Sequence, residues 1–353
     1  MKRERTQQLT YALRNRLEKM AAYGESKKTY KVKTLEMRRI ARNELIRQHK
    51  TREEINNALL HIDAAKDKIF SFNTMNSYIK FVKDFAGFVT SQTGTSRTSV
   101  EDSIRYIQPY VDYLINKGNS PNTINLKLSA VCKATGQFVI DYEHPVRRYA
   151  EAIRGVKPAV RDHFNEHRAA AALELNRAVG LRRAELGRLS VADIHWNDNG
   201  DIVITSIGKG GKHNNTLICD PEKIRIVEKY YYDAIADGRV TLLTKEQMNH
   251  DADLHHARAE CAIDEYNRVI TDIKDHPERR NYYKRFVIDF FRKNKKSLKE
   301  KLDVPYRLRG AGKKLMEQQG KDTVFDRVAV LYVSVTILHH YRSDTSVQHY
   351  LTK

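Results

Sequence analysis

Apolar residues between positions 71 and 89 recur at the spacing of an amphipathic helix. The segment SFNTMNSYIKFVKDFAGFV places them three or four positions apart, so that they fall on one face of a helix, with Asn73 or Thr74 as the cap. The residues expected on this face are Met75, Tyr78, Ile79, Val82, Phe85, Ala86 and Val89. The pattern therefore predicts a helix packed against a core.

Two more segments extend this helical pattern. An apolar stripe runs over residues 100–116, and Ser120-Pro121 is a typical helix start, with serine as N-cap and proline in the first turn. Residues 67–142 are therefore expected to form a compact bundle of about four short helices.

A β-hairpin is predicted in the second half of the chain. In GDIVITSIGKGGKHNNTLIC, residues 202–204 and 216–218 have strand character and flank a turn rich in glycine and asparagine at 208–215. The neighbouring segments have helical composition, namely Arg168–Val179, which ends at Gly180, 220–301 and 312–350. The expected fold class is mainly α with a small β-sheet.

The chain is expected to comprise four parts. Residues 1–66 form a basic N-terminal arm or helical extension, and 67–144 form the helical domain. A proline-bounded basic stretch makes 145–160 a linker, and 161–353 form an α+β domain with a helical insertion around 221–301.

The net charge of the chain indicates which class of partner it binds. The 353 residues hold 63 Lys and Arg against 44 Asp and Glu, a net charge of +19. Such an excess favours a polyanionic partner, because each cation placed on a phosphate releases a condensed counterion. Residues 1–50 carry 15 Lys and Arg against 5 Glu, which predicts an arm that contacts DNA or an extra helical layer. A solvated helical face explains the same excess equally well.

Cysteine usage and hydropathy restrict the compartment. Cys132, Cys219 and Cys261 are widely spaced and form no CxxC pair, which fits a reduced intracellular protein. No apolar run approaches the roughly 18 residues of a membrane span, and the first twenty residues have no apolar signal segment. A cytoplasmic protein with no membrane contact is expected.

Three separated motifs of the second half carry the chemistry. They are GLRRAELGRLSVADI at 180–194, IGKGGK at 207–212, and a C-terminal run with YRLRG at 306–310 and ILHHYRSDTSVQHYL at 337–351. In this order, behind a helical domain containing SPNTINLKLSAV, the sequence resembles the tyrosine recombinases of phages and transposons. The resemblance covers residues 67–353 and implies a SAM-like core-binding domain followed by an α+β catalytic domain.

The resemblance implies a role for five residues. The G-L-R-x-x-E turn of the family places its first active-site arginine on Arg182 and its glutamate on Glu185. The hairpin lysine falls on Lys209, the arginine of the H-x-x-R box on Arg309, and the nucleophile on Tyr350. Neighbouring side chains compete for three of these roles, namely Arg183 and Arg188, Lys212, and Arg307.

The sequence departs from the family pattern at two positions. Tyr306 stands where the H-x-x-R box begins with histidine, and a phenol with a reference pKa near 10 is a poor proton shuttle. The His or Trp expected about nine residues before the nucleophile is either His340, ten residues before, or Tyr341, nine before. Chemistry favours the imidazole and spacing favours the phenol.

These residues fit phosphodiester exchange. Two guanidinium groups can stabilise the extra charge of a pentacoordinate phosphorane, and a tyrosine attacking phosphorus conserves the bond energy as a 3′-phosphotyrosine. Nothing in the sequence calls for a metal or another cofactor. His250, His255, His256 and Cys261 lie close together, but their spacing matches no standard zinc frame, so a charged helical face is the preferred interpretation.

By resemblance, the chain is expected to be a site-specific recombinase or integrase that moves a mobile element through a Holliday junction. Its expected partners are double-stranded DNA attachment sites, three further copies in a homo-tetramer, and a directionality or DNA-bending protein, in a prokaryotic, nucleoid-associated setting. A catalytically inert DNA-binding protein of the same fold and a type IB topoisomerase stay open as alternatives.

Overall fold

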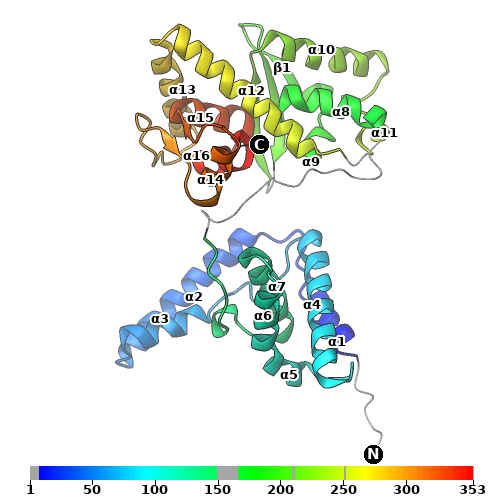
Figure 1. The fold of residues 1–353 in the computed structure, drawn as a ribbon, viewed down its shortest axis with the longest axis vertical. Coiled ribbons are helices and arrows are strands. Elements are labelled where there is room, and N and C mark those ends of the chain that lie inside the picture. Colours follow the sequence, from blue (N-terminus) through cyan, green and yellow to red (C-terminus); the bar gives the residue numbers. More distant parts are fainter. Residues whose placement is uncertain (1–7, 149–165, 209–210, 250–251, 353) are drawn as a thin grey trace, which may run out of the picture. The chain divides into compact units, whose positions relative to one another are not determined.

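The computed structural model describes residues 8–148, 166–208, 211–249 and 252–352 (Figure 1). The chain divides into two compact units, Met1–Arg147 and Arg148–Lys353, and each is described here by itself. The division falls inside the predicted linker. Helices dominate both units and a small sheet occurs in the second, which confirms the predicted fold class. Within the described residues, no helix combines the length and apolarity needed to cross a membrane.

The first unit is a helical bundle. Its elements are α1 (Leu9–Glu18), α2 (Lys27–Arg47), α3 (Arg52–Leu60), α4 (Phe72–Thr93), α5 (Val100–Ser103), η1 (Ile104–Tyr106), α6 (Ile107–Asn116), α7 (Pro121–Thr135) and η2 (Val139–Asp141). Leu9, Leu13 and Leu17 of α1 are buried in the same core as the apolar faces of α4, α6 and α7. Residues 1–66 are predicted from the sequence to be an arm or extension, whereas α1 is part of the bundle itself.

The helix starts of the bundle follow its side-chain caps. The hydroxyl of Ser71, two residues before the predicted cap, accepts a hydrogen bond from the Thr74 amide and starts α4. Ser120 caps α7 and Pro121 occupies its first turn, as predicted. Residues 100–116 are not one helix, because the 3₁₀ turn η1 separates α5 from α6.

The second unit combines helices with two small sheets. Its elements are α8 (Glu166–Val179), α9 (Arg183–Leu186), η4 (Val191–Asp193), β1 (Ile194–Trp196), β2 (Ile202–Gly208), β3 (Lys212–Ile218), α10 (Pro221–Ala236), α11 (Lys245–Met248), α12 (Leu254–Asp275), α13 (Arg279–Lys293), β4 (Tyr306–Arg307), α14 (Gly310–Gln318), β5 (Val324–Phe325), α15 (Arg327–Val333), the π-helical turn η5 (Ser334–Leu338), α16 (Ser343–Ser346) and the π-helical turn η6 (Val347–Leu351).

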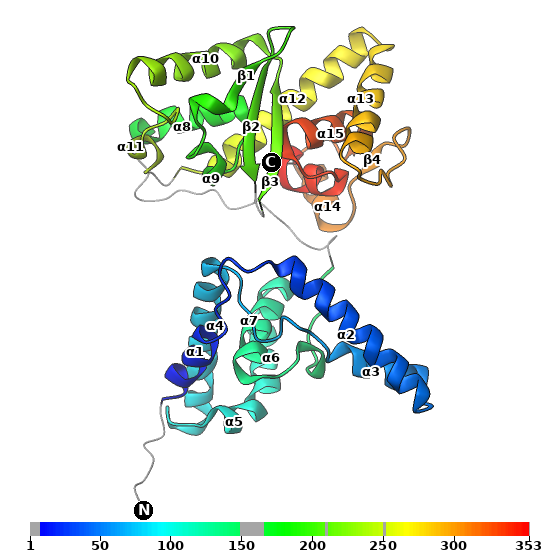
Figure 2. The ribbon, with the colours of Figure 1, turned by 180° about the vertical axis from the view of Figure 1, so that it is seen from behind.

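The main sheet is antiparallel in the order β1-β2-β3 (Figure 2). The predicted hairpin is present, with Ile202 opposite Ile218, but its turn is shorter than expected because Lys212 to Asn215 already belong to β3. Strand β1 was not predicted, since its three residues carry too little alternation to be distinguished from a loop.

Helix α12 is central to the second unit. Its first turns pack against both α8 and η6, and Val269, further along the helix, shares a core with α15 (Figure 1). Ala259, Cys261 and Ala262 lie in the same hydrophobic core as β2, β3 and α8. Helix α12, which the sequence predicts to be part of a helical insertion at 221–301, therefore forms the centre of this unit.

Candidate active site

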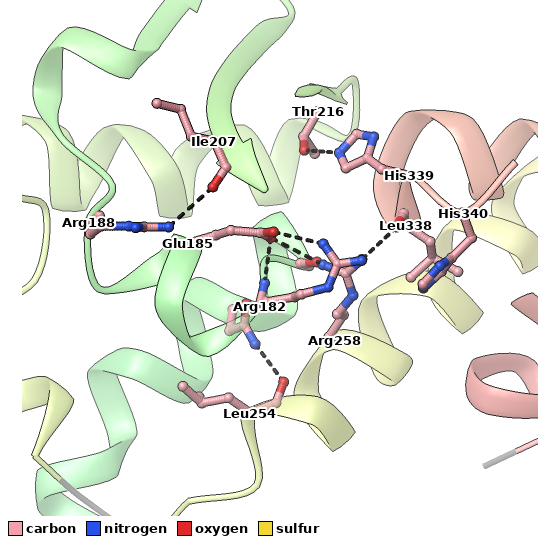
Figure 3. A network of polar contacts seen from close by, with 12 residues as sticks. Arg182, Glu185, Arg188, Ile207, Thr216, Leu254, Arg258, Leu338, His339 and His340 are labelled. Carbon is pink, nitrogen blue, oxygen red and sulfur yellow. Dashed lines mark hydrogen bonds and ion pairs between the residues drawn. The ribbon is translucent and has the colours of Figure 1, made fainter. Parts of the chain in front are cut away.

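A buried carboxylate orients the first arginine of the site. Arg182 is the N-cap of α9, and its Nη1 donates to Oε1 of Glu185 at 2.7 Å (Figure 3). The Arg182 amide donates to Oε2 of the same carboxylate at 2.9 Å. The Glu185 side chain is 2% exposed and that of Arg182 is 32% exposed. Glu185 thus fixes one edge of the guanidinium, and part of the remainder is open to solvent.

A second arginine, Arg258 of α12, lies on the other side of Glu185. Its side chain is 1% exposed, and its Nη1 is 3.7 Å from Oε2 of Glu185. Nη1 also donates to the Gly180 carbonyl at 2.6 Å, and Nη2 donates to the Leu338 carbonyl at 2.7 Å (Figure 3). Among the described residues the Nε–H has no hydrogen-bond partner. Burial lowers the pKa of Arg258, yet a guanidinium keeps its charge in proteins.

The start of α12 is fixed by two local contacts. Asp253 caps the helix by accepting from the amides of His255 and His256. The buried amide nitrogen of Asn176 on α8 donates to the Leu254 carbonyl at 2.7 Å. These bonds hold the first turns of α12, and with them Arg258, against the end of α8.

Tyr350 lies against Arg258 and contacts a histidine. Its ring centroid is 5.5 Å from the Arg258 guanidinium carbon, and its hydroxyl is 3.0 Å from Nε2 of His340. The ring of His255 meets the Tyr350 ring edge-on at 5.0 Å. Tyr350 belongs to the π-helical turn η6, a local geometry that is frequent at functional sites.

His340 is neutral. Burial, followed by the positive charges of Arg258 and Arg182, lowers the pKa of its imidazole to about 3. A neutral ring leaves one nitrogen as an acceptor, so Nε2 can take the hydroxyl proton of Tyr350. The arrangement places an unprotonated imidazole nitrogen within hydrogen-bond distance of the Tyr350 hydroxyl.

A pocket of about 360 Å³ opens beside this cluster. Arg182, Arg258 and His255 line it, together with Arg183, Ala252, Asp253 and Leu254. Arg182 and Arg258 both line this pocket, and a guanidinium group has the planar, two-donor geometry that suits a phosphate group.

Four of the residues proposed from sequence are brought together, namely Arg182, Glu185, His340 and Tyr350. Lys209 lies outside the described residues. Its neighbour Gly208 ends β2 beside the cluster, because a Cβ added there would be 3.3 Å from Oε1 of Glu185.

Three other proposed residues lie elsewhere. Arg309 is exposed at the N-cap of α14, and its side chain has no hydrogen bond or ion pair to any described residue. Tyr306 is half-buried in β4, with the Arg327 guanidinium 5.9 Å from its ring. Tyr341 packs against Phe290 and Phe291, with ring centroids 5.8 and 6.1 Å apart. Of the two candidates before the nucleophile, His340 is therefore the one that contacts Tyr350.

The competing neighbours also have distinct positions. Arg183 donates to the Ala252 carbonyl at 2.6 Å, and Arg188 donates to the Ile207 carbonyl at 3.2 Å, so both side chains stabilise neighbouring backbone segments. Lys212 lies 5.8 Å from the ring of Tyr341, and Arg307 is exposed on β4. None of these side chains shares the contacts of Arg182 with Glu185.

Arg258 and His255 join this cluster although the sequence pattern does not assign them to it. His255-His256-Ala257-Arg258 has the H-x-x-R spacing of the recombinase box, which is the signal that could identify them. The charge of this stretch favours a solvated helical face instead. Among the described residues, no group of three or more His, Cys, Asp or Glu side chains is placed to hold a metal ion, and His250 lies outside them.

Comparisons with known proteins found similar solved structures and no similar sequence family. No protein-family model matches the chain, and a search of the curated proteins found no match. The crystal structure of XerA recombinase is similar at 15% identity and a TM-score of 0.23, covering 79% of this chain and 88% of that one.

Two further similarities are to XerH site-specific recombinase bound to its difH substrate. The pre-cleavage complex matches at 12% identity and a TM-score of 0.38, over 97% of this chain and 91% of that one. The post-cleavage complex on a palindromic substrate matches at 12% identity and a TM-score of 0.37, over 97% and 90%.

Proposed function

We propose that this chain is a DNA-cleaving and rejoining enzyme of the tyrosine recombinase type, with Tyr350 as its nucleophile. The contact between the Tyr350 hydroxyl and the neutral imidazole of His340, next to a buried arginine, carries the proposal. A buried tyrosine with a base and two cations beside it is arranged for attack on a phosphodiester.

Arg182 and Arg258 form the phosphate clamp. Both line the same pocket, and Glu185 between them neutralises one of the two charges, which leaves the clamp with a net charge close to +1. This charge matches the single charge of a phosphodiester, and the fixed guanidinium groups stabilise the second charge that develops in the pentacoordinate transition state. Arg258 thus takes the role that the sequence analysis gave to Arg309.

Proton transfers follow from the same geometry. The Tyr350 oxygen attacks phosphorus while its proton passes to Nε2 of His340, and the bond to the 5′-oxygen breaks. A phosphate entering the pocket brings negative charge that offsets the field of Arg258 and Arg182, which raises the basicity of His340. Lys209, as the resemblance implies, protonates the departing 5′-oxygen. The product is a 3′-phosphotyrosine, and the reverse attack by a 5′-hydroxyl reseals the strand.

The wider role rests on the resemblance and on charge. A net charge of +19 and a strongly basic helix α2 support duplex DNA as the partner. Integration or excision of a mobile element, a homo-tetramer on attachment sites, a directionality or DNA-bending protein, a Holliday junction, and independence from metal and ATP all belong to this proposal as properties of the family type.

Covalent trapping tests the proposal. A duplex nicked close to the cleavage site loses a short fragment after attack, so the protein stays attached and survives SDS electrophoresis. Wild-type protein should form this adduct in EDTA without nucleotide, and Tyr350→Phe should form none while binding DNA normally. Tyr341→Phe is the matched control, because its ring packs in an aromatic cluster away from the nucleophile, and it should still form the adduct.

Adduct trapping, supercoil relaxation and strand joining together separate the alternatives. An inert DNA-binding protein would give no adduct with any duplex that it binds. A type IB topoisomerase would form the adduct and relax supercoiled DNA, but would not join strands from two different duplexes. Adduct formation by Tyr350→Phe would place the nucleophile elsewhere.

A further inference from the structure

A second histidine, His339, lies between the sheet and the segment that bears the nucleophile. It directly follows η5, and its side chain is buried. Its Nδ1 is 3.1 Å from the Val335 carbonyl oxygen, and its Nε2 is 3.0 Å from Oγ1 of Thr216 in β3 (Figure 3). Both ring nitrogens therefore have a partner, one from its own helical turn and one from the sheet.

These partners select one tautomer of the ring. The Val335 carbonyl can only accept, so Nδ1 carries the proton and donates it. Nε2 is then the acceptor, and the Thr216 hydroxyl donates to it. Burial and the nearby charge of Arg258 lower the pKa of His339 to about 4, which keeps the ring in this neutral form at ordinary pH. The ring is a fixed connector and not a proton carrier.

The backbone of His339 adopts a conformation that suits glycine better. Its φ is 53°, in the left-handed region where a Cβ is disfavoured. A glycine would take this conformation without that cost. The chain instead has a large side chain here, and both of its polar atoms are used, which indicates a role for the ring itself.

The turn that His339 anchors presents the base of the proposed reaction. The next residue is His340, whose amide donates to the Ser334 carbonyl at 3.1 Å and whose Nε2 contacts the Tyr350 hydroxyl. Ser346, four residues before Tyr350, donates from its hydroxyl to Oγ of Ser334 at 2.9 Å. Among these contacts the bond to Thr216 is the one that reaches the sheet.

We infer that His339 is a positioning residue that ties β3 to the turn carrying His340, so that the hairpin strand and the base hold a fixed distance. The inference rests on the proposed function for its kinetic consequence but not for its geometry. Strand β3 begins three residues after Lys209 in the sequence, so under the proposed function the same bond connects the base at Tyr350 to the strand that follows the proposed acid.

Thr216→Val and Thr216→Ser form the matched test pair. Valine keeps the shape of threonine and removes the hydroxyl, whereas serine keeps the hydroxyl and removes a methyl group. Single-turnover cleavage of a nicked duplex should slow by about tenfold in Thr216→Val, the scale of one hydrogen bond expressed in a rate. It should stay within about twofold of wild type in Thr216→Ser, and DNA affinity should change in neither variant.

A third variant separates the ring from the backbone conformation. His339→Gly relieves the left-handed backbone, so a purely structural histidine would be replaced without loss of rate. We expect cleavage by His339→Gly to slow by at least as much as cleavage by Thr216→Val. The double variant should be no slower than His339→Gly alone, because both changes remove the same hydrogen bond. Additive losses would contradict a shared bond.

A readout in free protein keeps this inference independent of DNA cleavage. With ¹⁵N-labelled histidine, the nitrogen resonances of His340, assigned with His340→Gln, should move in Thr216→Val and not in Thr216→Ser. If wild type forms no adduct but these resonances move, the proposed function fails and the tie stands. Unmoved resonances, or cleavage by Thr216→Val at the wild-type rate, overturn the tie whatever the fate of the proposed function.

Discussion

Replacing Arg258 by lysine keeps a positive charge in the site but removes a two-pronged contact. The guanidinium of Arg258 donates from Nη1 to the Gly180 carbonyl and from Nη2 to the Leu338 carbonyl, at 2.6 and 2.7 Å. A lysine ammonium is a single nitrogen and cannot occupy both of these positions. Arg309→Lys is the matched control, because Arg309 is exposed and has no polar partner among the described residues.

The structure sets the expected size of the loss of stability and of the loss of cleavage rate in Arg258→Lys. Loss of one charge-assisted hydrogen bond at a side chain that is 1% exposed should lower the free energy of unfolding by about 1.5–3 kcal/mol. Loss of one preorganised donor to the developing phosphorane charge should raise the activation barrier by about 3 kcal/mol, or roughly a hundredfold in rate. Arg309→Lys should change stability by less than about 0.5 kcal/mol and cleavage by less than about threefold.

Three measurements on each variant decide the assignment: urea unfolding, DNA affinity, and the single-turnover rate of adduct formation on a nicked duplex. Affinity should fall little in Arg258→Lys, because many other phosphate contacts remain. The reasoning is refuted if Arg309→Lys abolishes cleavage while Arg258→Lys cleaves near the wild-type rate. Equal losses of affinity and rate in Arg258→Lys would mean that this arginine serves binding and not the chemical step.

Two further predictions concern stability. Gly180 has a φ of 62°, and a Cβ added there would lie 2.7 Å from Cγ2 of Ile337, so Gly180→Ala should lower the free energy of unfolding by about 2–4 kcal/mol. Gly200→Ala is the control, with an expected loss of about 1 kcal/mol, because φ is 80° there but the space is open. Equal losses for the two variants in urea unfolding would contradict this prediction. Burial lowers the pKa of His340 to about 3 from a reference of 6.5, so the unfolded chain takes up a proton that the folded chain refuses, and stability should fall as the pH drops from 6.5 towards 3. Between pH 7 and pH 5 the melting temperature of His340→Gln should fall by less than that of wild type. An identical fall would exclude His340 as a source of the pH dependence of stability.

The bundle was predictable because its signals are local. The stripe from Met75 to Val89 and the Ser120-Pro121 start each depend on a few neighbouring residues, and the structure has helices at both places. The place of α1 in the core was not predictable, since burial of Leu9 and Leu13 depends on α4 and α7, which lie far along the chain.

The site was predictable where its residues lie within one motif. Arg182 and Glu185 are three residues apart, and one helical turn brings them together. Arg258 depends instead on the packing of α12 against the ends of α8 and η5, which no periodicity reveals. Its H-x-x-R spacing is visible in the sequence, but Arg309 lies in a second basic motif, and the contacts of Arg258 with Glu185 and Tyr350 distinguish the two only in the folded chain.

The two carbonyl partners of Arg258 make the candidate site depend on the folding of the whole second unit. One comes from Gly180, 78 residues earlier, and the other from Leu338, 80 residues later, so the buried guanidinium bridges distant parts of the chain. If either end of this unit opens, the arginine loses an acceptor and Tyr350 loses its cationic neighbour. Under the proposed function, a partly unfolded molecule would therefore lack a complete site for DNA cleavage, so cleavage would be confined to correctly folded molecules.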